Sequence, residues 1–369
     1  MKKVSRQDAL RIARLVISRH IQFLRHRETF RSGSRKINGR HTIYIEAPEV
    51  FSLTENYEET VNCLRKLKNT IVSSRLLNQR QRPYTHIDLS HIKTLEPAAA
   101  VVLAAELDRW RRVLGVSLRP RNLATWNKGV LTFLYDLRLF DLLEVDRRYV
   151  KSVLSLRVKS DVTEVALPFV SDCRNDKERT DRLADELARK VPKLLEILDE
   201  EGGMALSAAL AEASLNSVQH AYKYLQTEFP IVDDRWWAAA SYQDNGDTVK
   251  FFVYDQGVGI PATLPKTTVG QGILKFLGHN VDKVYPHSSD SEMIKQVLRG
   301  QISATEQKNR GKGFPQIVAA VTQQGGRLMV LSGKGGVIYT KASGAEKLPE
   351  NDVHLGGTLL EWTFRLDQP

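Results

Sequence analysis

Three polar side chains recur at four-residue intervals in the alanine-rich segment ALAEASLNSVQHAYKY. A helix is expected over residues 204–225, which predicts that Glu212, Asn216 and His220 lie on one helical face. The amide oxygen of Asn216 is a hard ligand of the kind that Mg²⁺ accepts beside phosphate oxygens and water. Glu212, one turn earlier, is placed to orient a water molecule or to accept a hydroxyl proton. A solvent-facing polar stripe would show the same spacing.

A second candidate site follows a predicted β-hairpin. Two strands, residues 235–242 and 248–254, are expected on either side of a tight Asn-Gly turn. The second strand leads into Asp255, Gly257 and Gly259. A carboxylate at a strand end can accept a hydrogen bond from the exocyclic amine of adenine, and the glycines let the backbone approach a ligand closely. An ordinary glycine-rich turn explains the glycines but not an aspartate after an apolar strand.

A third motif precedes a helix expected over residues 315–323. It contains Gly311, Lys312, Gly313 and Phe314. Backbone N–H groups of a glycine loop and the positive end of the following helix make a phosphate cradle, to which Lys312 can add a contact. By itself, a plain surface loop would explain this motif equally well.

A fourth motif, Gly356-Gly357-Thr358, leads into a predicted terminal strand, residues 359–364. The Thr358 hydroxyl can reach an adenine edge near Asp255, directly or through water. An ordinary turn before a strand would look the same.

The four motifs, in this order, resemble the asparagine box, the two glycine boxes and the late Gly-Thr motif of the gyrase, heat-shock-chaperone, histidine-kinase and MutL ATPases, abbreviated GHKL. This resemblance implies an α/β sandwich of the GHKL (Bergerat) type over residues 151–369, with ATP and Mg²⁺ as its ligands. It implies that Asn216 is the Mg²⁺ ligand, Glu212 the general base and Asp255 the adenine contact. Residues 262–308 would form a lid hinged at the third motif. The other residues that would bind the nucleotide are His220, Gly257, Gly259, Gly311, Lys312, Gly313, Phe314, Gly357 and Thr358.

Strands and helices also alternate in the first half, which indicates a layered α/β domain. The expected elements are a strand beginning at His41 and ended by Pro48, a helix over 57–77, a strand over 84–89, a helix over 96–113, a short strand over 116–118 and a helix over 125–143. Their order resembles the STAS family, the fold of bacterial anti-sigma-factor antagonists. Residues 42–150 are therefore predicted to form a smaller STAS-like α/β domain.

This chain departs from the STAS pattern at the start of the third predicted helix. Signalling members of that family carry a phosphorylated serine there, whereas this sequence reads Thr94-Leu95-Glu96-Pro97. Only Thr94 could replace the phosphoacceptor. Glu96 either resembles a permanently charged acceptor or is a carboxylate that favours the helix dipole. We therefore expect a fixed interaction module.

The segment between the two halves is expected to hold one or two strands within residues 151–170. A charged helical stretch over 176–201 follows, divided at Pro192 and stopped by Gly202-Gly203.

The composition is that of a two-domain globular protein. The chain has 369 residues and only two cysteines, far apart, so neither a disulfide framework nor a zinc site is expected. No apolar run is long enough to cross a bilayer. Arginines interrupt every apolar stretch near the N-terminus, so no secretory signal is predicted and the expected location is the cytoplasm.

The net charge of +11 is concentrated in residues 1–41, a basic segment with twelve Lys and Arg against two Asp and Glu. Such a segment can contact nucleic acid or another acidic surface. It can equally form an amphipathic helix, because apolar residues recur at helical spacing from Leu10 to Leu24.

Three functions follow from these residues and resemblances. The first is an ATP-dependent conformational switch or ATPase in a regulatory complex with a protein partner. The second is a protein serine/threonine kinase of the anti-sigma partner-switching type, since the asparagine-box string resembles that of the anti-sigma-factor kinases. A histidine kinase is disfavoured because residues 176–201 contain no His. The third is a nucleic-acid-linked ATPase that uses the basic segment. The resemblance is also compatible with a homodimer.

Overall fold

The chain folds into two compact units that divide between Val162 and Thr163, later than the expected boundary at residue 150. Both units mix helices and strands, as the predicted α/β class requires. Within the ranges given next, no helix combines the length and apolarity needed to cross a membrane. The computed structural model describes residues 34–37, 40–76, 84–114, 119–120, 122–155, 164–173, 177–192, 194, 200–222, 235–243, 247–264, 289–303 and 313–366.

The first unit contains a four-stranded sheet in the order β1-β2-β4-β6. Strands β2, β4 and β6 are parallel, and β1 pairs antiparallel with β2. A separate parallel pair joins β3 to β5. The strands are β1 (Ser34–Ile37), β2 (Arg40–Glu46), β3 (Val50–Phe51), β4 (Tyr84–Asp88), β5 (Thr94–Leu95) and β6 (Arg119–Pro120).

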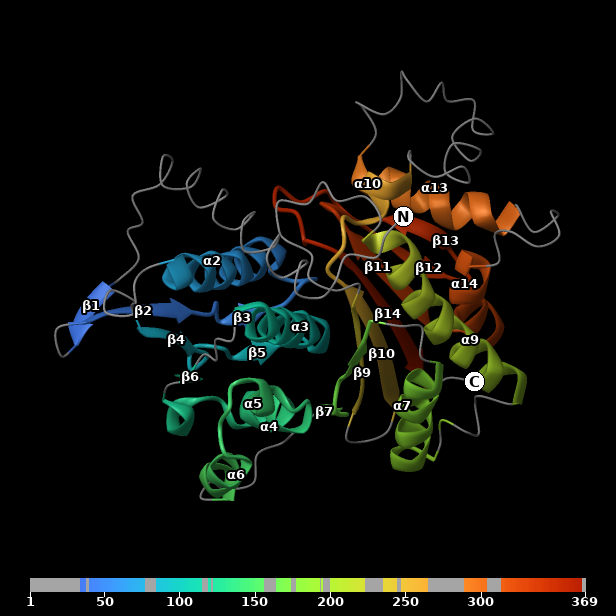
Figure 1. Ribbon diagram of the computed structural model, residues 1–369. Coiled ribbons are helices and arrows are strands. Elements are labelled where there is room, and N and C mark those ends of the chain that lie inside the picture. Colours follow the sequence, from blue (N-terminus) through green and yellow to red (C-terminus); the bar gives the residue numbers. More distant parts are fainter. Residues whose placement is uncertain are drawn as a thin grey trace. The chain divides into compact units, whose positions relative to one another are not determined.

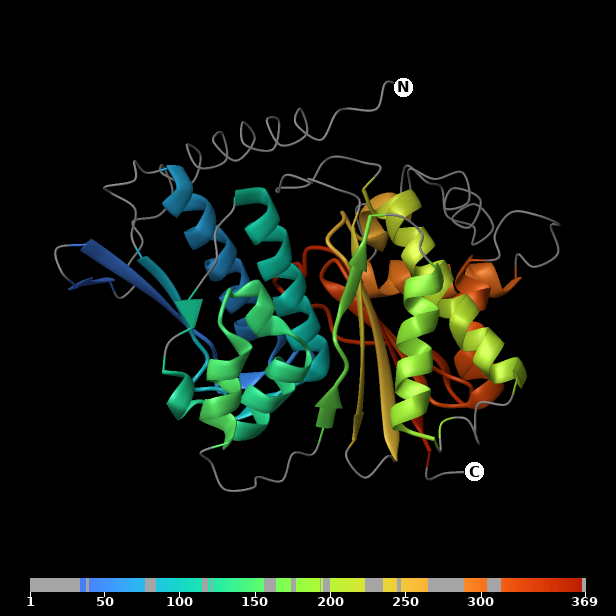
Figure 2. The same ribbon diagram turned by 60° about the horizontal axis from the view of Figure 1, so that its bottom comes forward.

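Helices α2 and α3 lie side by side in this unit (Figure 2), and α2 packs on β2 and β4. The alanine-rich start of α3 is almost completely buried, because small side chains let a helix approach its neighbours closely. The helices are α2 (Tyr57–Leu76), α3 (Pro97–Leu114), the 3₁₀ turn η1 (Leu123–Thr125), α4 (Lys128–Asp136), α5 (Leu139–Leu142) and α6 (Arg147–Ser155).

Two expectations for the first half need correction. The helix expected over 125–143 is broken, since Arg138 adopts a left-handed conformation with φ of 67° between α4 and α5. Residues 147–155 form α6, where the beginning of a strand region was expected. Part of the basic segment forms β1, while its first 33 residues, including the proposed amphipathic helix, lie outside the described residues, as does the strand expected over 116–118.

The second unit is built on an eight-stranded antiparallel sheet. Seven strands follow the order β13-β12-β11-β14-β10-β9-β7, and β8 also pairs with β9. The predicted hairpin is confirmed as β9 and β10, in which Phe251 pairs with Ala240. The strands are β7 (Glu164–Ala166), β8 (Val170–Asp172), β9 (Trp236–Gln243), β10 (Thr248–Asp255), β11 (Arg327–Ser332), β12 (Gly335–Thr340), β13 (Gly344–Lys347) and β14 (Thr358–Arg365).

One face of this sheet carries the core of the second unit. Alternate residues of adjacent strands, such as Phe251, Leu328 and Trp362, pack with apolar side chains of α7, α9, α13 and α14. Figure 1 shows α7, α9 and α14 lying over this sheet. The helices are α7 (Lys177–Lys190), α9 (Glu200–Asn216), the π-helical turn η2 (Ser217–Ala221), α10 (Ile260–Thr263), α13 (Asp290–Ser303) and α14 (Gly313–Gln324).

The charged helical stretch before the asparagine box is interrupted near Pro192 as predicted, since α7 finishes at Lys190. The predicted stop at Gly202-Gly203 is wrong. Helix α9 begins at Glu200 and continues through both glycines, because the buried side chains of its later turns hold it against the sheet.

Gly203 offers a direct test of this helix boundary. It is exposed within α9, and a Cβ added there would meet nothing within 4 Å. Gly203→Ala is therefore expected to raise the free energy of unfolding by about 0.5–1 kcal/mol, because alanine loses less backbone entropy in a helix. Denaturant unfolding measures this, and a loss of stability would contradict the continuous helix.

Candidate functional site

The asparagine-box residues lie where α9 changes its winding. Glu212 and Asn216 occupy the last turns of α9, and Asn216 is directly followed by the π-helical turn η2. A π turn holds more residues than an α turn, so the predicted four-residue stacking does not continue regularly to His220, which is exposed. The structure thus keeps Glu212 in contact with Asn216 and places His220 in the π turn, where it is exposed. Single π turns inside helices occur frequently at functional sites.

Asn216 carries a buried amide whose neighbouring acceptor is the carboxylate of Glu212. Its Nδ2 is shielded from solvent, and its contact with Glu212 does not reach regular hydrogen-bond geometry. An incompletely paired buried amide costs free energy, so a ligand or water could improve its hydrogen bonding. Rotation of the amide by 180° would place Oδ1 at the same position with almost unchanged shape.

Glu212 is half-buried next to this amide. Burial raises the pKa of its carboxyl group, while the Asn216 side chain acts in the opposite direction. A raised pKa brings a carboxylate closer to the range in which it accepts and releases protons near neutral pH. Glu212 is therefore chemically suited to act as a general base.

The second and fourth motifs meet at one edge of the sheet. Asp255, the last residue of β10, pairs in register with Thr358, the first residue of β14. Thr358 in turn pairs with Ser332, the last residue of β11. Because directly paired residues point to the same face, these three side chains form a polar row where the apolar helix-covered face ends.

Asp255 is the charged residue of this row, and only 6% of its surface is exposed. Burial raises the pKa of its carboxyl group to about 6, although hydrogen bonds from the N–H groups of Gly257 and Thr358 and from the Ser217 hydroxyl act in the opposite direction. The Gly257 N–H donates to Oδ1 at 2.9 Å, and the Ser217 Oγ lies 3.4 Å from Oδ2 and 3.0 Å from the Ala213 carbonyl oxygen, to which it also donates. All these donors are neutral, so none of them offsets the buried charge fully.

The π turn and the loop after β10 are in direct contact. The Val258 N–H donates to the Ala221 carbonyl at 3.0 Å. A Cβ added to Gly257 would lie 2.4 Å from the same carbonyl oxygen. Gly257 is therefore required for the close packing of its loop against the helix end, whereas the sequence had suggested close approach to a ligand.

The remaining glycines of this region also serve the local packing. Gly259 has a φ of 86°, and a Cβ there would lie 2.9 Å from the Ser332 hydroxyl. A Cβ on Gly357 would lie 1.8 Å from the carbonyl oxygen of Asp255. Gly259 and Gly357 thus let the second and fourth motifs pack more closely than residues with side chains would allow.

Gly357→Ala is expected to reduce the free energy of unfolding by about 3 kcal/mol or more, because its methyl group would overlap the backbone of β10. Gly344→Ala is the matched control. Gly344 has a φ of 68° but open space around it, so only the backbone strain of about 1 kcal/mol is expected. Equal losses for the two variants in denaturant unfolding would contradict the tight contact between β10 and β14.

The third motif is only partly described. Gly311 and Lys312 lie outside the described residues, while Gly313 and Phe314 begin α14, which packs against α9. The expected phosphate cradle therefore remains a prediction. Helix α14, which begins within this motif, packs against α9, the helix that carries Asn216.

The lid expected over 262–308 needs revision. Helix α13 lies inside this range, yet its Ile294 and Leu298 are fully buried in the core of the second unit. Ser291, near the start of α13, donates its N–H to Glu350 and accepts a hydrogen bond from the Gly336 N–H. Helix α13 thus packs into the core of the second unit in this structure. Residues 265–288 and 304–312 lie outside the described residues.

Two residues of the site were not predicted. Ser217 follows Asn216 directly, but its hydroxyl contacts Asp255 only because the π turn directs it there. Ser332 ends a strand for which the sequence interpretation made no prediction. An apolar run closed by Ser332-Gly333 was the available signal.

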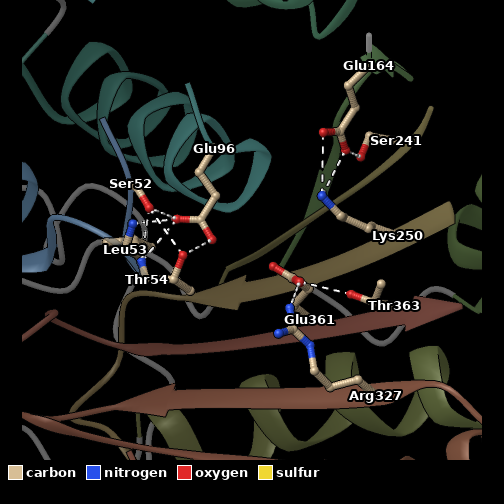
Figure 3. Close-up of polar contacts among 10 residues, drawn as sticks. All are labelled: Ser52, Leu53, Thr54, Glu96, Glu164, Ser241, Lys250, Arg327, Glu361 and Thr363. Atoms are coloured by element: carbon tan, nitrogen blue, oxygen red, sulfur yellow. Dashed lines mark hydrogen bonds and ion pairs between the residues drawn. The ribbon is translucent and has the colours of Figure 1, made fainter. Parts of the chain in front are cut away.

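Glu96 of the first unit is bound within its own unit (Figure 3). The Ser52 hydroxyl donates to its Oε2 at 2.6 Å, and the Thr54 hydroxyl donates to Oε1 at 3.1 Å. The N–H groups of Leu53 and Thr54 also donate to Oε2. Helix α3 begins one residue later, at Pro97. Glu96 therefore ties the loop after β3 to the start of α3, a role that neither sequence-based interpretation included.

Among the described residues, no group of three or more His, Cys, Asp or Glu side chains is placed to hold a metal ion. No protein-family model, curated protein or solved structure matches the chain significantly.

Proposed function

We propose that the second unit is a GHKL-type domain that binds ATP with Mg²⁺ where α9, β10 and β14 meet, and that the protein is an ATP-dependent conformational switch or ATPase. One observation carries this proposal. The buried carboxylate of Asp255 lies at the junction of three sequence motifs, with Thr358 on the neighbouring strand and Ser217, the residue after Asn216, within reach of it.

The energetics of Asp255 support a ligand. A buried carboxylate surrounded by neutral donors destabilises the folded protein at neutral pH. Such groups are found disproportionately at functional sites. An exocyclic amine donates hydrogen bonds without bringing a competing negative charge, so it complements this carboxylate.

Each residue then has a distinct role. Asp255 accepts a hydrogen bond from the adenine amine, and Thr358 reaches the adjacent ring edge. Asn216 would hold the metal as its protein ligand, through its amide oxygen. Glu212 accepts a proton from the attacking water or hydroxyl. A Mg²⁺ ion bound with the nucleotide would neutralise phosphate charge.

The residues fit such a metal. Mg²⁺ in nucleotide sites keeps several waters and phosphate oxygens and needs few protein ligands. The amide of Asn216, whose Nδ2 makes no hydrogen bond in regular geometry among the described residues, meets this requirement. The proposal therefore does not depend on a cluster of acidic side chains.

The first unit is proposed to be the STAS-like interaction module of this switch. Its parallel strands β2, β4 and β6, with α2 packed on two of them, support this assignment. The carboxylate of Glu96 is engaged by residues 52–54, which favours a structural role for it over that of a charged phosphoacceptor.

Incubation of the full chain with γ-labelled ATP and Mg²⁺ tests the reaction. Release of labelled phosphate supports an ATPase or switch that resets by hydrolysis. Transfer of label to the protein would favour the serine/threonine kinase instead. If the protein is folded but neither binds nor consumes ATP, the proposal is wrong.

A further inference from the structure

The carboxylate of Glu96 is held by a single short loop of the first unit, residues 52–54 (Figure 3). The N–H groups of Leu53 and Thr54 donate to Oε2, as does the Ser52 hydroxyl. The Thr54 hydroxyl donates to Oε1 at 3.1 Å. These donors are all neutral, so none of them offsets the negative charge of Glu96. The contact is therefore sensitive to a further negative charge placed beside it.

Thr54 carries the accessible hydroxyl of this network. It is exposed in the loop between β3 and α2. Ser52 is only 2% exposed, and its hydroxyl oxygen accepts the N–H groups of Thr54 and Glu55. Thr60, whose hydroxyl accepts the Ser52 N–H, is completely buried. A modifying enzyme can therefore reach the Thr54 hydroxyl but not the hydroxyls of Ser52 and Thr60.

Acidic side chains follow Thr54 in the sequence. Glu55 is next to it, and Glu58 and Glu59 lie in the first turn of α2. An enzyme that binds this stretch needs a basic substrate-binding surface, because complementary charge favours recognition. The sequence around Thr54 therefore fits a kinase that recognises acidic substrates.

We propose that Thr54 is a phosphorylation site for a protein serine/threonine kinase, and that the phosphate releases residues 52–54 from Glu96. In this reaction Thr54 Oγ1 forms a bond to the γ-phosphorus of ATP, the bond between that phosphorus and the β,γ-bridging oxygen breaks, and ADP leaves. The hydroxyl proton passes to Glu96 Oε1, to which it already points, and then to solvent. The inference does not rest on the proposed ATP site, because a kinase on another molecule can supply the reaction.

The release follows from charge and hydrogen bonding. A phosphate on Thr54 carries a charge of about −1.5 to −2 at neutral pH, and it would replace a hydroxyl that now donates to Glu96. The donor to Oε1 is lost, and two negative groups face each other where one was held by neutral donors. The phosphate oxygens also compete with Glu96 for the N–H groups of Leu53 and Thr54. The loop after β3 should therefore separate from the start of α3.

Phosphorylation is tested by incubating the full chain with γ-labelled ATP and Mg²⁺, with and without an extract of the cells that produce the protein. Peptide mass spectrometry locates the phosphate. Thr54→Val should abolish the label on this loop, whereas Thr94→Val, the matched control, removes another exposed threonine near the start of α3 and should retain it. Label on Thr54 without extract shows that the chain phosphorylates itself, and label only with extract shows a separate kinase. Either result supports the inference, and absence of phosphate from Thr54 in both reactions would overturn it.

The conformational effect is tested on the full chain synthesised with phosphothreonine at position 54. Hydrogen–deuterium exchange of the Leu53 and Thr54 N–H groups should become about tenfold faster, because both lose Glu96 as their acceptor. Glu96→Gln removes the repelling charge, so phosphorylation should change the exchange less in this variant than in wild type. If the phosphorylated chain does not fold, Thr54→Glu should show the same change with smaller amplitude. Unchanged exchange at both N–H groups would overturn the release of the loop.

Discussion

Glu212→Gln is expected to lower the rate of ATP turnover by about 10²–10⁴-fold while changing ATP affinity little. Glutamine keeps the size and hydrogen-bonding shape of the side chain but cannot accept a proton. The half-buried position of Glu212 beside the Asn216 amide makes it the group suited to this transfer. Single-turnover measurement of phosphate release or of label transfer gives the rate of the chemical step.

Glu346→Gln provides the control for this experiment. Glu346 is exposed on β13, at the opposite edge of the sheet order from β7, so its loss should not affect turnover. If Glu212→Gln retained wild-type turnover, Glu212 would not be the general base. If it lost ATP binding as well, its role would be in binding rather than in proton transfer.

Asp255→Asn is expected to lower ATP affinity by about 10–100-fold, because a charge-assisted hydrogen bond to the adenine amine is lost. Discrimination between ATP and GTP should also decrease. Asp185→Asn is the matched control, since Asp185 is exposed on α7. Isothermal titration calorimetry with both nucleotides measures the effect, and unchanged affinity in Asp255→Asn would exclude this carboxylate from the adenine site.

Asp255→Asn, which is expected to weaken ATP binding, is expected to stabilise the folded protein at neutral pH. Burial raises the pKa of Asp255 from 3.8 to about 6, so the folded state holds its proton more strongly than the unfolded state. The stability that this proton contributes is present below pH 4 and is lost as the pH rises through 6. The shift corresponds to about 3 kcal/mol.

Asp255→Asn removes this dependence on pH. The difference in unfolding free energy, variant minus wild type, should therefore increase by about 2.4 kcal/mol between pH 4 and pH 7 in nucleotide-free protein. ATP binding should favour the ionised carboxylate, so wild-type affinity should fall below pH 6 more than that of the variant. Denaturant unfolding at several pH values tests this, and a constant difference would contradict the raised pKa.

Local sequence signals predicted those parts of the fold that depend on local chemistry. The hairpin of β9 and β10, predicted from the Asn-Gly turn signal between them, and the division near Pro192 were predicted correctly because each follows from backbone geometry. Asp255 was recognised as unusual because a carboxylate directly follows an apolar strand. The structure brings Asp255 and Thr358 together through strand pairing.

The features that the sequence interpretation missed depend on tertiary contacts. Helix α13 has buried residues at helical spacing, including Ile294 and Leu298, but the family resemblance had assigned this region to a lid. The π turn ends in the hydrogen bond between Ala221 and Val258, and no local pattern encodes that bond. Ser332 acquires its position only when β11 pairs with β14.

Calorimetric titration of ATP into the full chain in the presence of Mg²⁺ tests the central claim most directly. The proposed site predicts saturable binding of one ATP per chain that weakens when Mg²⁺ is removed and when GTP replaces ATP. Absence of saturable binding at millimolar ATP, in protein shown to be folded by circular dichroism, would contradict the assignment of the junction of α9, β10 and β14 as a nucleotide site.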